Sequence, residues 1–132
     1  MFVEERIYTV VPGKAPDFLK LYENEGMAIQ ARYLPAMVGY YSSDIGTLNL
    51  IVHQWAFEDV NQRVEARACM VADPDWQAYL VKLMPLILHQ ESRMLVPAPF
   101  FQKRLASMID FSRKERAALL AASEGASQGA IA

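Results

Sequence analysis

Residues 49–57, NLIVHQWAF, decide the fold, because two kinds of side chain alternate through the whole stretch. Successive side chains of a β-strand point to opposite faces of its sheet, so the alternation predicts a strand with two different faces. One face carries the aliphatic residues Leu50, Val52 and Ala56, and we expect these to serve the core. The other combines a titratable ring with large apolar groups and indicates a lined pocket; its members are Asn49, Ile51, His53, Trp55 and Phe57.

Three further strands and two helical regions surround this stretch. Alternation and aromatic content predict strands over 2–11, 36–43 and 86–96. Helical spacing starts at Ala15, and Asp59 and Asp73 stand where helix N-caps are expected. The order is therefore βαββαβ, the ferredoxin-like α+β fold, in which helices cover one face of a four-stranded antiparallel sheet.

In that topology the first and third strands are neighbours at the centre of the sheet. Glu4, Arg6 and Tyr8 of the first strand then lie beside the His53 face of the third. We expect this shared face to be the one without helices. A bare face that is partly apolar is typical of an interface or a ligand surface.

Composition narrows the class of protein. A chain of 132 residues fits one domain, and a formal charge of -2 gives no general attraction to nucleic acid or anionic lipid. The single cysteine, Cys69, excludes an internal disulfide and a thiolate-rich zinc site.

The sequence has no secretory pattern at its start and no apolar run long enough for a membrane span, so we expect a cytoplasmic protein. A content of 53% hydrophobic residues favours an extra buried interface.

The chain divides at residue 100 into a main domain, 1–100, and an extension, 101–132. The extension has helical spacing, and Ser112 begins a capping box that predicts a new helix start there. We expect the end, EGASQGAIA, to be disordered. The sequence leaves three roles open for the extension: a solvated tail, a helix docked on its own domain, or a contact for a protein partner.

Several motifs occur in one order through residues 1–100. They are Tyr8 with Pro12-Gly13-Lys14, Gly46 with Leu48-Asn49, His53 with Trp55, Asp73-Pro74 with Trp76, Gln90-Glu91-Ser92-Arg93, and Pro97-Ala98-Pro99-Phe100. In this combination the chain resembles the NIPSNAP-type family of dimeric α+β barrel proteins. The resemblance implies a homodimer in which two sheets face each other across a twofold axis and enclose a lumen. Relatives have been linked to protein interaction and trafficking, and barrels of this architecture include cofactor-independent monooxygenases.

His53 is the central residue of the candidate site. Beside Arg6 and Tyr8 it could act as a general base, contact a ligand, or simply fill the lumen with a hydrogen-bonded ring. Arg6 could bind a carboxylate or pair with Glu91 of the last strand. The sequence leaves the facing of two strands open. Either Tyr40 or Tyr41 of the second strand faces the lumen, and on the last strand either the set Gln90, Ser92 and Met94 or the set His89, Glu91 and Arg93 does. We favour Tyr41 and Glu91 as the lumen residues. The expected ligand-binding set is Glu4, Tyr41, Ile51, Trp55, Phe57 and Glu91.

We assign no metal and no cofactor. His53, His89 and Glu91 have the composition of an iron-binding triad, but their strands are not expected to bring them together. Two functions remain. The first is a cytoplasmic homodimer that binds a small, partly aromatic or apolar molecule in the lumen, with cofactor-independent acid–base or oxygenation chemistry as an option. The alternative is a non-catalytic scaffold whose extension recruits a protein partner. The sequence does not decide whether the protein is an enzyme.

Overall fold

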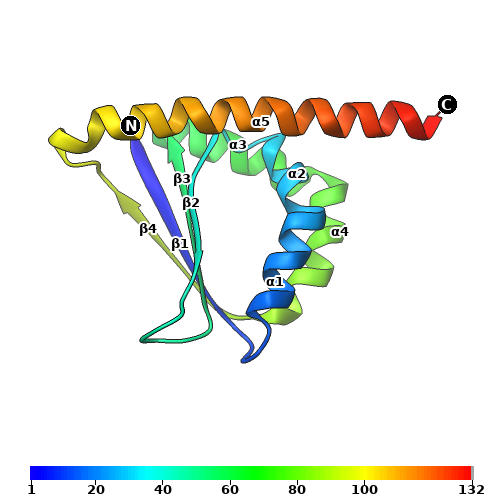
Figure 1. Ribbon diagram of the computed structural model, residues 1–132, viewed down its shortest axis with the longest axis horizontal. Coiled ribbons are helices and arrows are strands. Elements are labelled where there is room, and N and C mark those ends of the chain that lie inside the picture. Colours follow the sequence, from blue (N-terminus) through cyan, green and yellow to red (C-terminus); the bar gives the residue numbers. More distant parts are fainter. Residues whose placement is uncertain (132) are drawn as a thin grey trace.

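The computed structural model describes the backbone of residues 1–131 and the side chains of 1–126, and it has the predicted βαββαβ order (Figure 1). None of the helices in this part of the chain is both long and apolar enough to cross a membrane. The elements are β1 (Phe2–Val10), α1 (Ala15–Leu21), the π-helical turn η1 (Tyr22–Gly26), α2 (Met27–Ala31), β2 (Ala36–Ser42), β3 (Leu50–Phe57), α3 (Val60–Ala72), α4 (Pro74–Leu83), the 3-10 turn η2 (Met84–Leu86), β4 (Ile87–Leu95), the 3-10 turn η3 (Pro99–Phe101) and α5 (Gln102–Ile131).

The four strands form one antiparallel sheet in the order β2-β3-β1-β4. This is the ferredoxin-like arrangement, and β1 and β3 are central neighbours as predicted. Their register pairs Glu4 with Trp55, Arg6 with His53, and Tyr8 with Ile51. Since residues directly opposite each other share a face, the polar residues of β1 lie beside the aromatic residues of β3.

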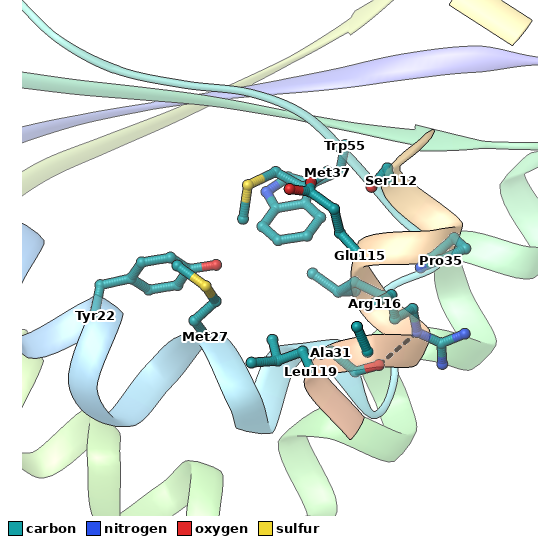
Figure 2. A pocket seen from close by; sticks show the side chains of 12 residues that line it. Tyr22, Met27, Ala31, Pro35, Met37, Trp55, Ser112, Glu115, Arg116 and Leu119 are labelled. Carbon is teal, nitrogen blue, oxygen red and sulfur yellow. Dashed lines mark hydrogen bonds between the residues drawn. The ribbon is translucent and has the colours of Figure 1, made fainter. Parts of the chain in front are cut away.

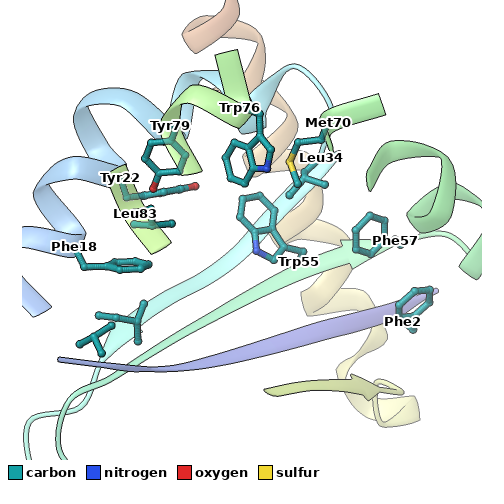
Figure 3. Packing of buried hydrophobic residues seen from close by; sticks show 12 residues of the cluster. Phe2, Phe18, Tyr22, Leu34, Trp55, Phe57, Met70, Trp76, Tyr79 and Leu83 are labelled. Carbon is teal, nitrogen blue, oxygen red and sulfur yellow. The ribbon is translucent and has the colours of Figure 1, made fainter. Parts of the chain in front are cut away.

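The helices cover the opposite sheet face from the one expected. We call the face that carries His53 and Trp55 the inner face, because it packs against Phe18 of α1 and Trp76 of α4 (Figure 3). The face predicted to serve the helix-covered core, which includes Val52, is the outer face. Strict alternation separates two faces but does not say which of them the helices will cover. The prediction that the His53 face is bare and lines a lumen between subunits was therefore wrong.

A β-bulge in β2 reverses the predicted facing of its two tyrosines. The register shifts between Met37 and Gly39, so that Tyr40 pairs with His53 and Tyr41 with Val52. An extra residue in one strand moves every later side chain to the other face. Tyr40 therefore lies on the inner face and the exposed Tyr41 on the outer face, which corrects the preference for Tyr41.

β4 is an edge strand, and its register corrects the prediction that Glu91 shares a face with His53. Arg6 lies opposite Ser92, and Ile7 lies opposite Glu91. Ser92 and Gln90 are thus on the inner face, whereas Glu91 is on the outer face. The predicted ion pair between Arg6 and Glu91 does not form, because the two side chains are on opposite sides of the sheet.

The two predicted N-caps are confirmed, but α3 presents an unexpected face to the sheet. Asp59 accepts the Gln62 backbone N–H at 2.8 Å, and Asp73 accepts that of Asp75 at 2.8 Å. We expected Val60, Val64, Ala68 and Val71 to form the buried stripe of the first of these helices. Instead the three valines are more than half exposed, and the inward positions of α3 are Gln62, Arg63, Ala66, Arg67 and Met70.

Gly26 ends the π-helical turn η1, and its contact with α4 explains why glycine is there. A Cβ atom at this position would lie 2.5 Å from Cζ of Tyr79. The glycine therefore lets η1 approach the buried Tyr79 ring closely. This contact helps to fix the distance between the two helices that cover the inner face.

The extension forms one helix, α5, which docks on its own chain across one end of the sheet (Figure 1). Leu105 is 1% exposed and packs against Val3, Ala36, Val38 and Ala56 of the outer face. Ser112 is buried within the helix and does not cap a new one. The helix also continues to Ile131, where disorder was expected, because the alanine-rich sequence has high helix propensity; Ala132 lies outside the described residues.

Candidate functional site

A cavity of about 230 Å³ lies between the inner face and the covering helices. We call it the helix–sheet cavity. The sheet contributes mostly polar groups, while α1 and α4 contribute apolar and aromatic groups, which is typical of a ligand pocket. Its lining is Arg6, Tyr8, Phe18, Tyr22, Gln30, Tyr40, His53, Arg67, Val71, Trp76, Tyr79, Leu80, Leu83, Met84, Ile87 and Gln90.

His53 is held on the floor of this cavity by three aromatic side chains. The Tyr40 ring stacks on it at 4.8 Å and 15°, and the Tyr8 ring meets it edge-on at 4.8 Å. The indole N–H of Trp55 donates to Nδ1 of His53 at 2.6 Å. These contacts fix the position of the imidazole, which is only 2% exposed.

The bond from Trp55 also fixes the protonation of His53. An indole N–H can only donate, so Nδ1 must be the unprotonated nitrogen and Nε2 carries the hydrogen of the neutral ring. Burial, followed by the positive charge of Arg6, lowers the pKa of His53 to about 3, so the ring is neutral near pH 7. Nε2 is buried and has no hydrogen-bond partner in the part of the chain that the structure describes. His53 therefore presents a hydrogen-bond donor, and this state is unsuited to the role of general base, one of the three roles that the sequence left open.

A buried charge cluster adjoins the cavity. The carboxylate of Glu4, 1% exposed, accepts two bonds from Arg63, at 3.0 and 2.7 Å, and one from Ser92 at 2.6 Å. Arg6 bridges the cluster to the cavity by donating to Glu4 at 3.2 Å and to the Tyr8 hydroxyl at 3.1 Å. Burial alone would raise the pKa of Glu4, but these hydrogen bonds and the nearby guanidinium charges lower it to about 2.

Arg67 is the one charged group of the cavity lining that stays unsatisfied. Arg6 is paired with Glu4, but in the part of the chain that the structure describes the Arg67 side chain has no hydrogen bond and no ion pair. Burial, followed by the positive charge of Arg6, lowers its pKa from the ordinary value. No aspartate or glutamate among the described residues lines the cavity. The cavity therefore has an excess of positive charge.

The structure brings only part of the predicted site together. Arg6, Tyr8 and His53 line the helix–sheet cavity, and Glu4 lies behind them in the charge cluster. Ile51, Trp55 and Phe57 share the inner face but belong to its packed core, where Phe57 stacks on Phe2. Tyr41 and Glu91 face the other way.

Arg63 and Arg67 are site residues that sequence reasoning missed, whereas Tyr40 and Ser92 were the less favoured of two open alternatives. Arg63 and Arg67 are four residues apart, so they share one face of α3. That spacing was the available signal, but the valine stripe of the same helix obscured it. Tyr40 depended on the bulge, which the sequence does not reveal.

The residues considered for a metal triad do not converge. His89 and Glu91 lie on the outer face, whereas His53 is on the inner face. Within the described residues, no three histidine, cysteine, aspartate or glutamate side chains are grouped as metal ligands would be.

A larger and more open cavity of about 600 Å³ separates α5 from α2 (Figure 2). We call it the tail groove. Arg116 holds α5 in place by donating to the backbone carbonyls of Ala31 and Arg32, at the end of α2. The groove is lined mainly by apolar side chains, among them Met27, Leu119 and Trp55. Its charged groups are either bound, like Arg116, or exposed, like Glu115, so it holds no unsatisfied buried group like that of the helix–sheet cavity.

These features define a ferredoxin-like α+β protein with a polar cavity under its helices and an added C-terminal helix. The chain belongs to the NIPSNAP family, which it matches over residues 3–102. The match ends at the first residue of α5, so the tail groove is built partly from a helix that lies outside the family region.

Among curated proteins, the chain is similar to Protein NipSnap homolog 3A of Homo sapiens. The two are 30% identical over 102 residues, which is 76% of this chain and 40% of the human protein. Protein NipSnap homolog 2 of Danio rerio is 35% identical over 60 residues, or 46% of this chain and 21% of that protein. The chain thus spans less than half the length of these relatives.

Solved structures support the same family and fold. A NIPSNAP family protein of unknown function from Agrobacterium tumefaciens is 44% identical with a TM-score of 0.74, covering 76% of this chain and 90% of that one. An uncharacterised NIPSNAP-like domain protein from Burkholderia xenovorans is 42% identical with a TM-score of 0.73, covering 75% and 86%. A putative antibiotic biosynthesis monooxygenase from Nitrosomonas europaea shares the fold at 12% identity and a TM-score of 0.53, covering 74% of this chain and 98% of that chain.

Proposed function

We propose that this NIPSNAP family protein binds a small, partly aromatic or apolar molecule in the helix–sheet cavity. The observation that carries the proposal is the buried Nε2–H of His53, which has no partner on the cavity floor. Leaving such a donor unsatisfied costs about 1–3 kcal/mol, a cost that a ligand acceptor would remove. The rings of Tyr8 and Trp76 in the same lining offer surfaces on which a flat molecule could pack.

His53 would act on such a ligand as a hydrogen-bond donor. A neutral imidazole that donates through Nε2 can orient a carbonyl or carboxyl oxygen and polarise it, without gaining or losing a proton. In any reaction in the cavity, His53 would then stabilise the negative charge that develops on that oxygen. Proton abstraction by His53 would require a different tautomer.

The two histidines of the chain give a matched test. We expect a panel of monocyclic aromatic compounds, both neutral and charged, to contain ligands that change tryptophan fluorescence, because Trp76 lines the cavity. His53→Phe should weaken their binding about five- to tenfold through the lost hydrogen bond. His89→Phe, on the exposed outer face, should leave binding unchanged.

Nitrogen NMR of the imidazoles provides a second readout that does not depend on choosing a ligand. The expected result is a neutral His53 ring with hydrogen on Nε2 at pH 7. A spectrum with hydrogen on Nδ1, or equal effects of the two histidine substitutions on every ligand of the panel, would contradict the proposal.

We also infer that the chain forms a homodimer through its outer sheet face. The fold is that of dimeric α+β barrels, and α5 covers only one end of this face. Tyr41 is 57% exposed there, and β4 is exposed along nearly its whole length. A second copy packed on this surface would cover both.

Sedimentation of single-site variants tests the dimer. Tyr41→Asp should shift the protein from dimer to monomer at micromolar concentration, because it places a charge in the proposed interface. Val81→Asp is the control, since Val81 is 76% exposed on α4, on the helical side of the molecule. A monomeric wild type, or an unchanged Tyr41→Asp dimer, would argue against this interface.

The alternative of a recruiting tail has weaker support. The first half of α5 packs on the chain's own sheet through Leu105, and Arg116 binds it to the end of α2. These contacts tie the inward side of the helix to its own domain, so a protein partner would have to bind the exposed side, which includes Phe111. We therefore favour ligand binding over a scaffold role.

A further inference from the structure

Positive charges outnumber negative charges around the helix–sheet cavity, and the packing of the fold does not explain this excess. Three guanidinium groups, those of Arg6, Arg63 and Arg67, surround the single carboxylate of Glu4. Glu4 is already engaged by Arg6 and Arg63. Arg67 is left on the cavity wall with two like charges nearby and no partner among the described residues.

A cation in this position costs stability unless something neutralises it. Burial without a partner disfavours a charged group, and the neighbouring arginines add repulsion. A residue selected only for packing would not need a guanidinium here. Two buried groups of the same lining also have no partner among the described residues, the Nε2–H of His53 and the hydroxyl of Tyr79, and each of them can donate. Arg67 and His53 can only donate and therefore require an acceptor, and Arg67 favours one with negative charge.

We propose that the helix–sheet cavity is selective for a small aromatic or apolar carboxylate, whose oxyanion is bound by Arg67 and by the Nε2–H of His53. This inference rests on the proposed function and adds the charge class of the ligand. The guanidinium fork suits a planar carboxylate, to which it can donate two parallel bonds. The apolar part of the molecule would pack against Phe18, Leu83 and Trp76 at the helical wall.

The size of the cavity limits the ligand to about one ring. Its volume of about 230 Å³ corresponds to roughly eight water molecules at the ~30 Å³ that each occupies in the liquid. A benzoate is of a size that this volume accommodates. Benzoate and its neutral isostere benzamide are therefore suitable probes.

Calorimetric titration of the full chain with these two probes tests the charge class. We expect benzoate to bind at least tenfold more tightly than benzamide. Arg67→Gln should remove this preference while leaving benzamide binding within twofold, and Arg67→Lys should give an intermediate preference because it keeps the charge but loses the fork. Lys20→Gln, which removes an exposed positive charge of α1 on the helical side of the molecule, is the control and should keep the full preference.

Thermal unfolding without ligand separates a binding role from a structural one. If Arg67 exists to bind an anion, Arg67→Gln should be at least as stable as the wild type, because it removes a half-buried charge that has no partner among the described residues. A clear loss of stability in Arg67→Gln would assign the residue to the fold and overturn the inference.

The remaining outcomes divide the two proposals. Equal affinity for benzoate and benzamide would leave the ligand cavity standing and refute its charge selectivity. Sulfate that competes with benzoate at equal concentration would refute the aromatic part of the ligand. Failure of both probes, with no other monocyclic compound bound, would count against the cavity itself.

Discussion

Replacing Glu4 with glutamine is expected to lower the free energy of unfolding by about 3–5 kcal/mol, the usual cost of removing one member of a buried ion pair. The carboxylate is 1% exposed and receives bonds from Arg6, Arg63 and Ser92. Without it, three guanidinium groups would repel one another beneath the helices, with no negative charge among them. Denaturant titration at pH 7 measures the loss.

The neighbouring glutamate provides a matched control. Glu5 lies on the outer face and is joined to Gln54 by one bond of 3.3 Å. Glu5→Gln should therefore change stability by no more than about 1 kcal/mol. Comparable losses in the two variants would mean that the cluster around Glu4 contributes little.

The stabilisation by Glu4 should decrease as the pH falls, and acid titration measures this decrease. The pKa of Glu4 is lowered from 4.5 to about 2, so its stabilisation is fully present above pH 4.5 and is lost as the pH falls toward 2. Glu4→Gln should therefore lose less further stability than the wild type over that interval. His53 also has a lowered pKa, from 6.5 to about 3, and contributes acid destabilisation to both proteins in the same direction.

The sequence predicted the order of elements and the grouping of Glu4, Arg6, Tyr8 and His53 because both follow from alternation and topology. It could not predict which face the helices would cover, because period-2 alternation is symmetrical. Polar residues at Glu4, Arg6 and His53 suggested an open face. In the structure Arg63, Trp55 and Ser92 satisfy much of that polarity, so those residues can be buried under helices.

The remaining differences arise from local geometry. A single extra residue between Met37 and Gly39 exchanges the facings of Tyr40 and Tyr41, and composition gives no sign of it. On α3 the valines suggested a buried stripe, although the sheet beneath carries a carboxylate that binds arginine. Arg63 points inward because its guanidinium group pairs with the buried Glu4 carboxylate. The two residues are 59 positions apart, so the periodicity of the helix sequence cannot reveal this pairing.

Leu105→Ala is expected to lower the free energy of unfolding by about 2–5 kcal/mol, the range for truncating a buried leucine. Leu105 belongs to α5, outside the family match, yet it is 1% exposed and closes a small core with Val3, Ala36 and Ala56. If the extension were a solvated tail, this substitution would have almost no effect. Chemical denaturation measures the change.

Phe111 on the same helix is the matched control, because it is 64% exposed. Phe111→Ala should change stability by no more than about 0.5 kcal/mol. A large loss for Leu105→Ala with little change for Phe111→Ala would make the helix part of the domain. The tail groove would then be a built feature of this chain, since one of its walls is the same helix that Leu105 holds against the sheet. Equal, small losses would instead mean that α5 is not packed stably on the domain, and would favour the scaffold alternative.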